Sequence, residues 1–158
     1  MSSLKSTELV VFEVSGCHFS LPLAIVEEVV PATKITLIPN SPAFLLGLAA
    51  VRGKVLGVID ASKRYGLPNS LNGYFLVCMV RGNLTAISID QPIFAGQLYV
   101  RELPDSEKEK LRAKFSMDPK FVNGAYEIFQ TTDDAGATQS SGIYTLSVEP
   151  DLFVSAEM

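Results

Sequence analysis

The sequence contains no tryptophan, a single histidine and only two cysteines, Cys17 and Cys78, which lie far apart in the chain. A structural zinc site needs about four ligands at close spacing, so we expect neither a metal nor a cofactor. No Gly-rich phosphate loop, dinucleotide fingerprint or Gly-x-Ser-x-Gly elbow is present. The first eight residues lack the apolar stretch of a signal peptide, so we expect a cytoplasmic protein with reduced thiols.

Long apolar runs and an excess of positive charge are also missing. Pro, Asn, Arg and Gly interrupt every run before it reaches the ~20 residues of a membrane-spanning helix, which predicts no direct membrane insertion. With 13 basic and 17 acidic residues the net charge is -4, and nucleic-acid binding needs a basic face. The 158 residues, 47% hydrophobic and 19% charged, suffice for one domain or for two small lobes that share a core.

Short apolar or alternating segments, separated by Gly and Pro turns, recur along the chain and predict β-strands. They are 9–14, 17–21, 34–38, 48–51, 54–59, 74–80, 84–90, 121–129 and 143–148. The segment Tyr74 to Val80 is apolar without interruption, which predicts a strand covered on both faces. The pattern as a whole indicates an all-β fold with short helices, either barrels or a sandwich.

Four of the predicted helical elements have a clear local signal. Pro22 opens a helical turn in which Leu21, Ile25 and Val29 share one face, and Pro31 ends it. Ser41-Pro42 starts a single turn, and Asp60 caps a helix that Gly66 ends. Residues 104–115 form a charged surface helix. Residues 131–142 are polar or small, which is typical of a mobile hairpin tip.

One arginine, Arg52, lies in the almost wholly apolar run from Leu37 to Asp60, beside Gly53 at a predicted hairpin turn. Arginine presents a planar set of donors and is enriched at interface hot spots, so Arg52 is a candidate anchor for a helical partner. The alternative is an internal salt bridge, with Glu28 as the candidate acceptor.

Three side chains are the candidates for catalysis or ligand binding: Asp60, Asp90 and His18. The two aspartates end predicted strands, where Asp is far more often a cap or turn former than an acid or base. His18 adjoins Cys17, but neighbours on a strand point to opposite faces and do not form a nucleophilic pair. A small enzyme or ligand-binding barrel therefore stays an alternative, as does an unrelated barrel that binds peptides by strand addition.

The order of residues between Leu37 and Asp60 is Pro, Ala-Phe, Gly, an Arg-Gly turn and an apolar strand ending in Asp. This order resembles the signature of the CheW-like domain, the coupling module of bacterial chemosensory arrays. Val26-Glu27-Glu28-Val29 is similar to the family's Val-x-Glu-Ile/Val element. The resemblance implies two small SH3-like five-stranded β-barrels packed together, as a single domain over 8–156 after a flexible N-terminus over 1–7.

The resemblance also implies a function: a non-enzymatic adaptor that couples methyl-accepting chemoreceptors to a CheA-like histidine kinase. Its partners would be the receptor's cytoplasmic tip and the kinase's own CheW-like regulatory domain, and the cytoplasmic protein would be recruited to membrane receptor arrays. The implied partner-binding residues are Val26, Glu28, Gly47, Arg52 and Gly53.

Five positions depart from the family pattern. Ala50 replaces the usual Asn, Gly57 the usual Pro, Ala61-Ser62 the usual Leu-Arg and Gln91 the usual Gly. Residues 92–120 show no clear match, and their charged helix looks like an insertion. The departures favour a divergent coupling protein, of the kind that serves a pilus-motility or phototaxis pathway.

Overall fold

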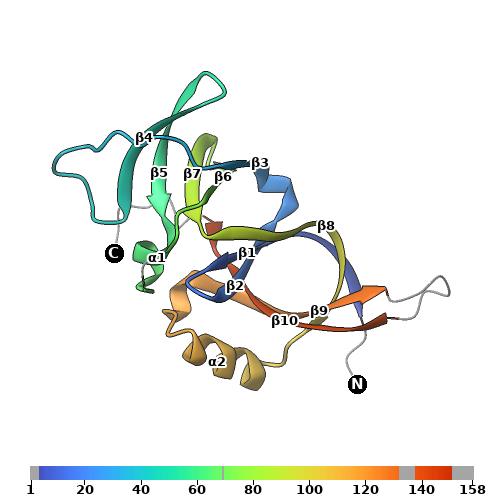
Figure 1. The fold of residues 1–158 in the computed structure, drawn as a ribbon. Coiled ribbons are helices and arrows are strands. Elements are labelled where there is room, and N and C mark those ends of the chain that lie inside the picture. The colour runs from blue at the N-terminus through green and yellow to red at the C-terminus, as the bar shows by residue number, and fades with distance from the viewer. Residues whose placement is uncertain (1–3, 69, 132–137, 151–158) are drawn as a thin grey trace.

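The computed structural model describes residues 4–68, 70–131 and 138–150, which form two five-stranded sheets and two short α-helices (Figure 1). The first sheet is a closed barrel in the order β1-β2-β10-β9-β8. Its strands are β1 (Lys5–Val14), β2 (Cys17–Pro22), β8 (Gln91–Glu102), β9 (Val122–Thr131) and β10 (Thr138–Val148).

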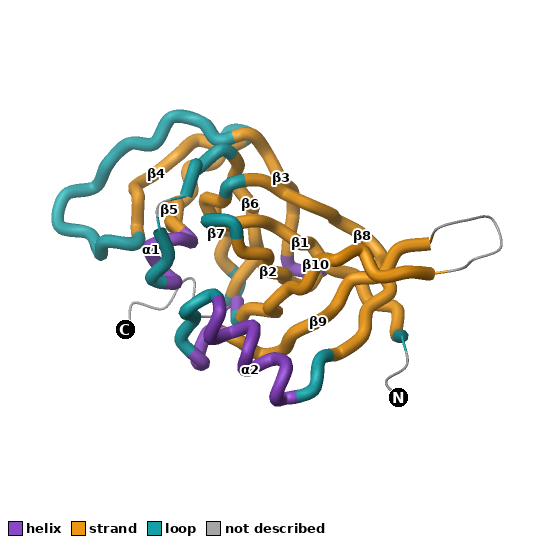
Figure 2. The backbone as a smooth tube through the Cα atoms, turned by 60° about the horizontal axis from the view of Figure 1, so that its bottom comes forward, coloured by secondary structure: helices purple, strands orange, loops and turns teal. Residues whose placement is uncertain are grey.

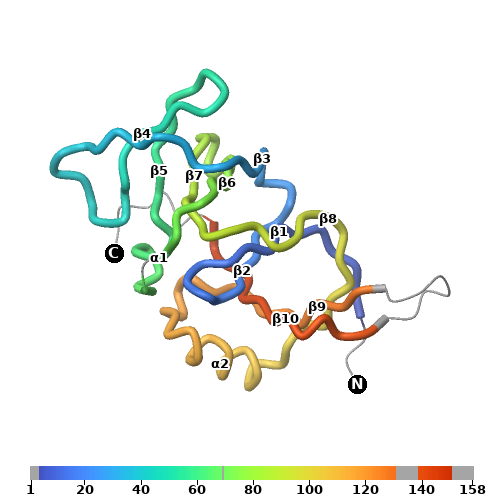
Figure 3. The backbone as a smooth tube through the Cα atoms, in the orientation of Figure 1, coloured from blue at the N-terminus to red at the C-terminus, as the bar shows by residue number. Residues whose placement is uncertain are grey.

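The second sheet has the order β3-β6-β7-β5-β4, with β3 and β4 as its terminal strands. Its strands are β3 (Val26–Pro31), β4 (Leu45–Val51), β5 (Lys54–Asp60), β6 (Tyr74–Val80) and β7 (Asn83–Ile89). The chain therefore starts in the barrel, builds the whole second sheet and returns to the barrel at β8 (Figure 3). The mostly-β fold with two five-stranded units, expected from the resemblance, is confirmed.

The two sheets are joined by one large hydrophobic core. Phe12, Phe19 and Leu146 come from the barrel and pack in the same cluster as Leu76 and Ile87 from the second sheet. Alternate residues of β6 serve two clusters: Leu76, Cys78 and Val80 face this shared core, and Phe75 and Val77 face a second cluster with β4 and β5. The prediction that this apolar strand is covered on both faces is confirmed.

Helices occupy only a small part of the described chain (Figure 2). Helix α1 (Ala61–Tyr65) begins at Asp60, whose carboxylate accepts hydrogen bonds from the Ser62 and Lys63 amides, and it ends at Gly66 with φ of 74°. Helix α2 (Asp105–Lys114) lies beside the barrel, followed by the 3-10 turn η2 (Pro119–Phe121). Both helices were predicted, because their caps and charge patterns are local in the sequence.

The predicted helix over 22–31 is wrong beyond its first turn. Only η1 (Leu23–Ile25) is helical, and Val26–Pro31 is strand β3, paired antiparallel with β6. The spacing of Leu21, Ile25 and Val29 imitated a helical face. Three β-branched valines and the ladder offered by β6 favour the strand instead.

The strand predicted over 34–38 is also wrong. Residue Thr36 makes one isolated bridge, to Leu48, in place of a strand. The single turn predicted after Ser41-Pro42 is present, with the Leu45 amide donating to the Pro42 carbonyl (3.0 Å), but it is not helical, and the Ser41 hydroxyl donates to the Ile38 carbonyl (3.0 Å) instead of capping it. Conversely, β8 was not predicted from the sequence. Its partner strands β1 and β9 are distant in sequence, and Pro92 and Gly96 interrupt the alternation of apolar and polar residues that is typical of a strand.

Two expected mobile segments overlap strands. β1 begins at Lys5, so residues 5–7 of the N-terminal segment lie in the barrel, and residues 1–3 are outside the described part. β9 runs to Thr131 and β10 starts at Thr138, so both ends of the expected loop over 131–142 are strand. Residues 132–137, and the domain's expected end at 156, lie outside the described residues.

Candidate functional site

The turn between β4 and β5 consists of two residues, Arg52 and Gly53, between the paired residues Val51 and Lys54. Both have positive φ, 49° and 79°, which is the geometry of the tight hairpin turn that matches strand twist. Glycine adopts this conformation freely, whereas arginine does so at a small energetic cost. The predicted Arg-Gly hairpin is confirmed, and it projects away from the body of the sheet (Figure 1).

The guanidinium of Arg52 donates from Nε to Oε1 of Glu28 at 2.6 Å. The Arg52 side chain is nevertheless 74% exposed, against 30% for Glu28. The two interpretations left open by the sequence, an internal salt bridge and an exposed cation, therefore both describe this residue. Most of the guanidinium faces solvent, where it is accessible to a partner.

A bulge in β3 separates Val26 from Glu28. Val26 pairs with Cys78 and Glu28 with Val77, so Glu27 is an extra residue on β3. Without it, the two positions would share one face of the strand. With it, Val26 packs against the shared core, while Glu28 points to the opposite face, where Arg52 lies. The structure thus brings Glu28, Arg52 and Gly53 together and places Val26 on the opposite face of the sheet.

Gly47 lies near the opposite end of β4 from the Arg52 turn. Its φ is 150°, and a Cβ there would be 2.1 Å from the Thr36 carbonyl oxygen. The backbones of Thr36 and Leu48 exchange two hydrogen bonds, of 2.7 and 2.8 Å, directly beside it. Gly47 is buried and has no side chain, so its role in the structure is to let the segment around Thr36 pack directly against β4.

An open pocket with a volume of about 240 Å³ lies beside the Arg52–Glu28 pair. It is lined by Glu27, Glu28, Val51, Arg52, Lys54, Leu56, Val77, Met79 and Leu84. Charged residues of both signs form its rim, and buried residues such as Val77 form its floor. This arrangement fits an apolar partner side chain flanked by charged or polar groups.

Of the lining residues, sequence reasoning identified only Glu28 and Arg52, and Met79 and Leu84 are among those that it missed. They are cross-strand partners next to the turn between β6 and β7, and Met79 is 38% exposed although its neighbours Cys78 and Val80 are buried. Methionine is common at adaptable binding surfaces, but the sequence does not show which residue of an apolar run is exposed.

Each of the three catalytic candidates has structural partners, and Asp60 and Asp90 are linked indirectly, through hydrogen bonds of Ser62 and Ser70. Asp60 is 3% exposed and caps α1, whereas the Asp90 carboxylate accepts hydrogen bonds from the amides of Ser15 (2.9 Å) and Leu71 (2.7 Å). His18 Nε2 lies 3.5 Å from a Glu13 carboxylate oxygen. Among the residues that the structure describes, no three His, Cys, Asp or Glu side chains are grouped so as to hold a metal ion.

Fold and surface together define a two-sheet β domain with a charged hairpin at the rim of an apolar pocket. The sequence model of the CheW-like domain matches residues 8–128, and the chain belongs to this family.

Two curated relatives match part of the chain. It is 30% identical over 86 residues to a probable chemotaxis protein CheW of Rhizobium etli, and 29% identical over 86 residues to a chemotaxis protein CheW of Rhizobium meliloti. Each match covers 52% of this chain and 56% of the relative. The chain thus spans about half the length of the curated relatives it matches.

The fold has a solved counterpart. The crystal structure of scaffolding protein TtCheW from Thermoanaerobacter tengcongensis superposes with a TM-score of 0.68 at 24% identity, over 96% of this chain and 95% of that one. The family model also spans residues 92–120, so the expectation that this segment has no family match is wrong. Separately, none of the helices in the described residues has the length and apolar character needed to cross a membrane.

Proposed function

We propose that this protein is a non-enzymatic adaptor that couples methyl-accepting chemoreceptors to a CheA-like histidine kinase. Membership of the CheW-like family supports the proposal, as do relatives whose names place them in chemotaxis. The observation that carries it is the exposed Arg52 guanidinium, held by Glu28 beside an apolar pocket on a projecting hairpin.

The mechanism is binding and positioning. Glu28 holds the Arg52 side chain in one orientation, so less conformational entropy is lost when a partner binds the remaining donors. Arg52 and Gly53 would contact the partner, and Glu28 would orient Arg52. Val26 and Gly47 would act indirectly. Val26 would anchor β3 to the core, and Gly47 would let the segment around Thr36 pack against β4.

The two partners would be the CheW-like regulatory domain of the kinase and the cytoplasmic tip of the receptor. The protein would be cytoplasmic and recruited by these contacts to receptor arrays at the membrane. Receptor conformation would then bias the kinase through a fixed geometry, without a chemical step in the adaptor itself. A pilus-motility or phototaxis pathway would fit the departures at Ala50 and Gly57.

The test is binding of the purified kinase domain and receptor fragment to Arg52→Ala. An interface hot spot loses ~2 kcal/mol on truncation, so we expect about thirtyfold weaker binding of one or both partners. The chain offers a matched control, because Arg81-Gly82 forms a second two-residue turn with positive φ at both positions, 51° and 77°.

Arg81→Ala removes the same charge from the same kind of turn, and we expect it to bind within about twofold of wild type. Unchanged binding by Arg52→Ala would disprove the role of Arg52. An equal loss in both variants would show that the loss is not specific to the β4–β5 hairpin.

A further inference from the structure

A second groove lies on the other side of the molecule, between α2 and the barrel. It has a volume of about 290 Å³ and is lined by Arg101, Leu103, Glu107, Lys110, Leu111, Lys114 and Tyr144. Its apolar surface comes from Leu103, Leu111 and the Tyr144 ring, which is 40% exposed. In Figure 1 this helix and the β4–β5 hairpin lie at opposite ends of the molecule, so the two surfaces are separate.

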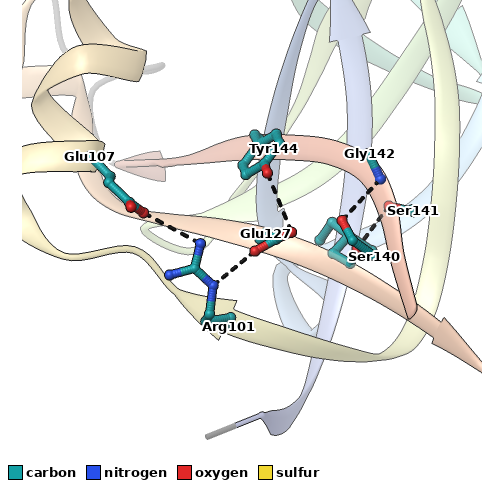
Figure 4. A network of polar contacts seen from close by, with 8 residues as sticks. Arg101, Glu107, Glu127, Ser140, Ser141, Gly142 and Tyr144 are labelled. Carbon is teal, nitrogen blue, oxygen red and sulfur yellow. Dashed lines mark hydrogen bonds and ion pairs between the residues drawn. The ribbon is translucent and has the colours of Figure 1, made fainter. Parts of the chain in front are cut away.

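One wall of the groove is held by a network of polar contacts (Figure 4). Arg101 on β8 donates to Glu127 on β9 at 2.8 Å and to Glu107 on α2 at 3.3 Å. The Tyr144 hydroxyl donates to the other oxygen of Glu127 at 3.3 Å. Arg101 thereby ties the helix to the barrel, and because its one positive charge is shared between two carboxylates, this network offers no unpaired cation to a ligand.

The opposite wall carries positive charge that is not balanced. Most charged side chains of α2 have ion-pair partners within 4 Å: Asp105 with Lys108, Glu107 with Arg101, and Glu109 with Arg112. Lys110 and Lys114 have no such partner in the described part of the chain, and both line the groove. They are four residues apart, so their side chains emerge on one face about 6 Å from each other.

We propose that this groove binds an acidic peptide segment of a partner protein. Two carboxylates of the segment would meet Lys110 and Lys114, and an apolar side chain between them would enter the space above Leu103, Leu111 and Tyr144. Two neighbouring lysines without ion-pair partners among the described residues attract a segment of opposite charge. The concave apolar floor fits a side chain better than it fits the flat surface of an anionic membrane.

The probe is a fluorescein-labelled helical peptide of about 14 residues with a leucine between two glutamates four positions apart. Fluorescence anisotropy with the full chain measures its binding at low salt. Lys110→Glu combined with Lys114→Glu places like charges opposite the peptide, so we expect about tenfold or greater loss of affinity. Lys108→Glu is the matched control on the same helix, outside the groove, and its affinity should stay within about twofold of wild type.

Two altered peptides test the two halves of the proposal. Glutamine at both glutamate positions, or alanine at the leucine, should each weaken binding to the wild-type chain. Amide NMR spectra should show peptide-induced shifts at residues 103–114, and circular dichroism should show that the variants are folded.

The proposal is overturned if the double variant binds as wild type does, or if Lys108→Glu loses affinity equally. Shifts at residues 51–54 in place of the groove would overturn it too, as would binding to anionic phosphatidylserine vesicles without binding to the peptide. Loss of kinase or receptor binding by Arg52→Ala has no bearing on this groove, so the two proposals fail independently.

Discussion

Arg52 and Glu28 connect the two terminal strands of the second sheet, which share no backbone ladder. Glu28 belongs to β3 and Arg52 to the turn that ends β4, and their side chains meet at 2.6 Å. Near the other end of β4, the Thr36–Leu48 bridge brings the segment after β3 against the same strand. The sheet is thus drawn together at one end by backbone hydrogen bonds and at the other by a single exposed ion pair.

We expect this ion pair to contribute little to folding. Exposed pairs contribute ~0.5 kcal/mol because solvent screens them and ordering the side chains loses entropy. A double-mutant cycle with Glu28→Gln and Arg52→Gln, measured by urea unfolding, should give a coupling energy of this size. A coupling energy above about 2 kcal/mol would contradict this expectation and show that the pair mainly stabilises the fold by joining β3 to β4.

Gly47→Ala should destabilise the protein strongly. A Cβ at this position would overlap the Thr36 carbonyl oxygen, at 2.1 Å, and φ of 150° is unfavourable for alanine. We expect a loss of about 3 kcal/mol in the free energy of unfolding, measured with urea. Gly53→Ala is the control, since a Cβ there meets nothing within 4 Å and only the positive φ opposes it, at about 1 kcal/mol. Equal effects would contradict the steric explanation.

Asp90→Ala should destabilise the junction between the sheets. Its carboxylate accepts from the Ser15 and Leu71 amides and from the Ser70 hydroxyl, and it is 8% exposed. Removing the acceptor leaves part-buried donors unpaired, so we expect a loss of about 2–3 kcal/mol by thermal or urea unfolding. Asp90→Asn keeps one acceptor oxygen and should lose less. If both variants were as stable as wild type, solvent would be satisfying these donors.

Acid should weaken the barrel through Glu127. Burial alone would raise the pKa of this carboxyl, but hydrogen bonds from Ser140 and Arg101 and the Arg101 charge hold its pKa below the ordinary value. The folded pKa is lower than the unfolded one, so this contribution is complete above the unfolded value of ~4.3 and is lost as pH falls through the folded pKa. The free energy of unfolding of Glu127→Gln should therefore depend less steeply on pH below about 4.3 than that of wild type. Parallel profiles would contradict this assignment.

The two thiols should react at different rates. Burial raises the pKa of Cys78 to about 12 and also raises the pKa of half-buried Cys17, which Lys114 partly offsets. The thiolate is the reactive form, so at pH 8 a disulfide reagent should label Cys17 slowly and Cys78 only after unfolding. The Cys17→Ser variant isolates Cys78, and rapid labelling of that variant under native conditions would contradict the prediction.

Local features of the fold were predictable from the sequence, because each depends on neighbouring residues. The Arg52-Gly53 turn needs two positive φ angles between apolar strands, and the cap of α1 needs an Asp whose carboxylate accepts from the amide two residues later. The uninterrupted apolar run of β6 requires that both faces of this strand be buried, whichever segments of the chain pack against them. In the same way, the order of motifs from Val26 to Asp60 was enough to indicate the family.

Features that depend on distant residues were not predictable. Val26–Pro31 became a strand because β6 supplied a ladder, and β8 formed because β1 and β9 flank it in space. The bulge at Glu27 turned Glu28 towards Arg52 and Val26 towards the core, although a simple strand would have placed both residues on one face.

By itself the sequence determined the β class, the Arg-Gly hairpin and the family, since these follow from short-range patterns and from the order of motifs. Only the tertiary structure decided that Arg52 is both paired with Glu28 and largely exposed, and that Lys110 and Lys114 line a groove whose other wall comes from β8 and β10. The physical reason is that burial and charge pairing depend on which distant segments meet. That choice is made by packing the whole chain around a shared core.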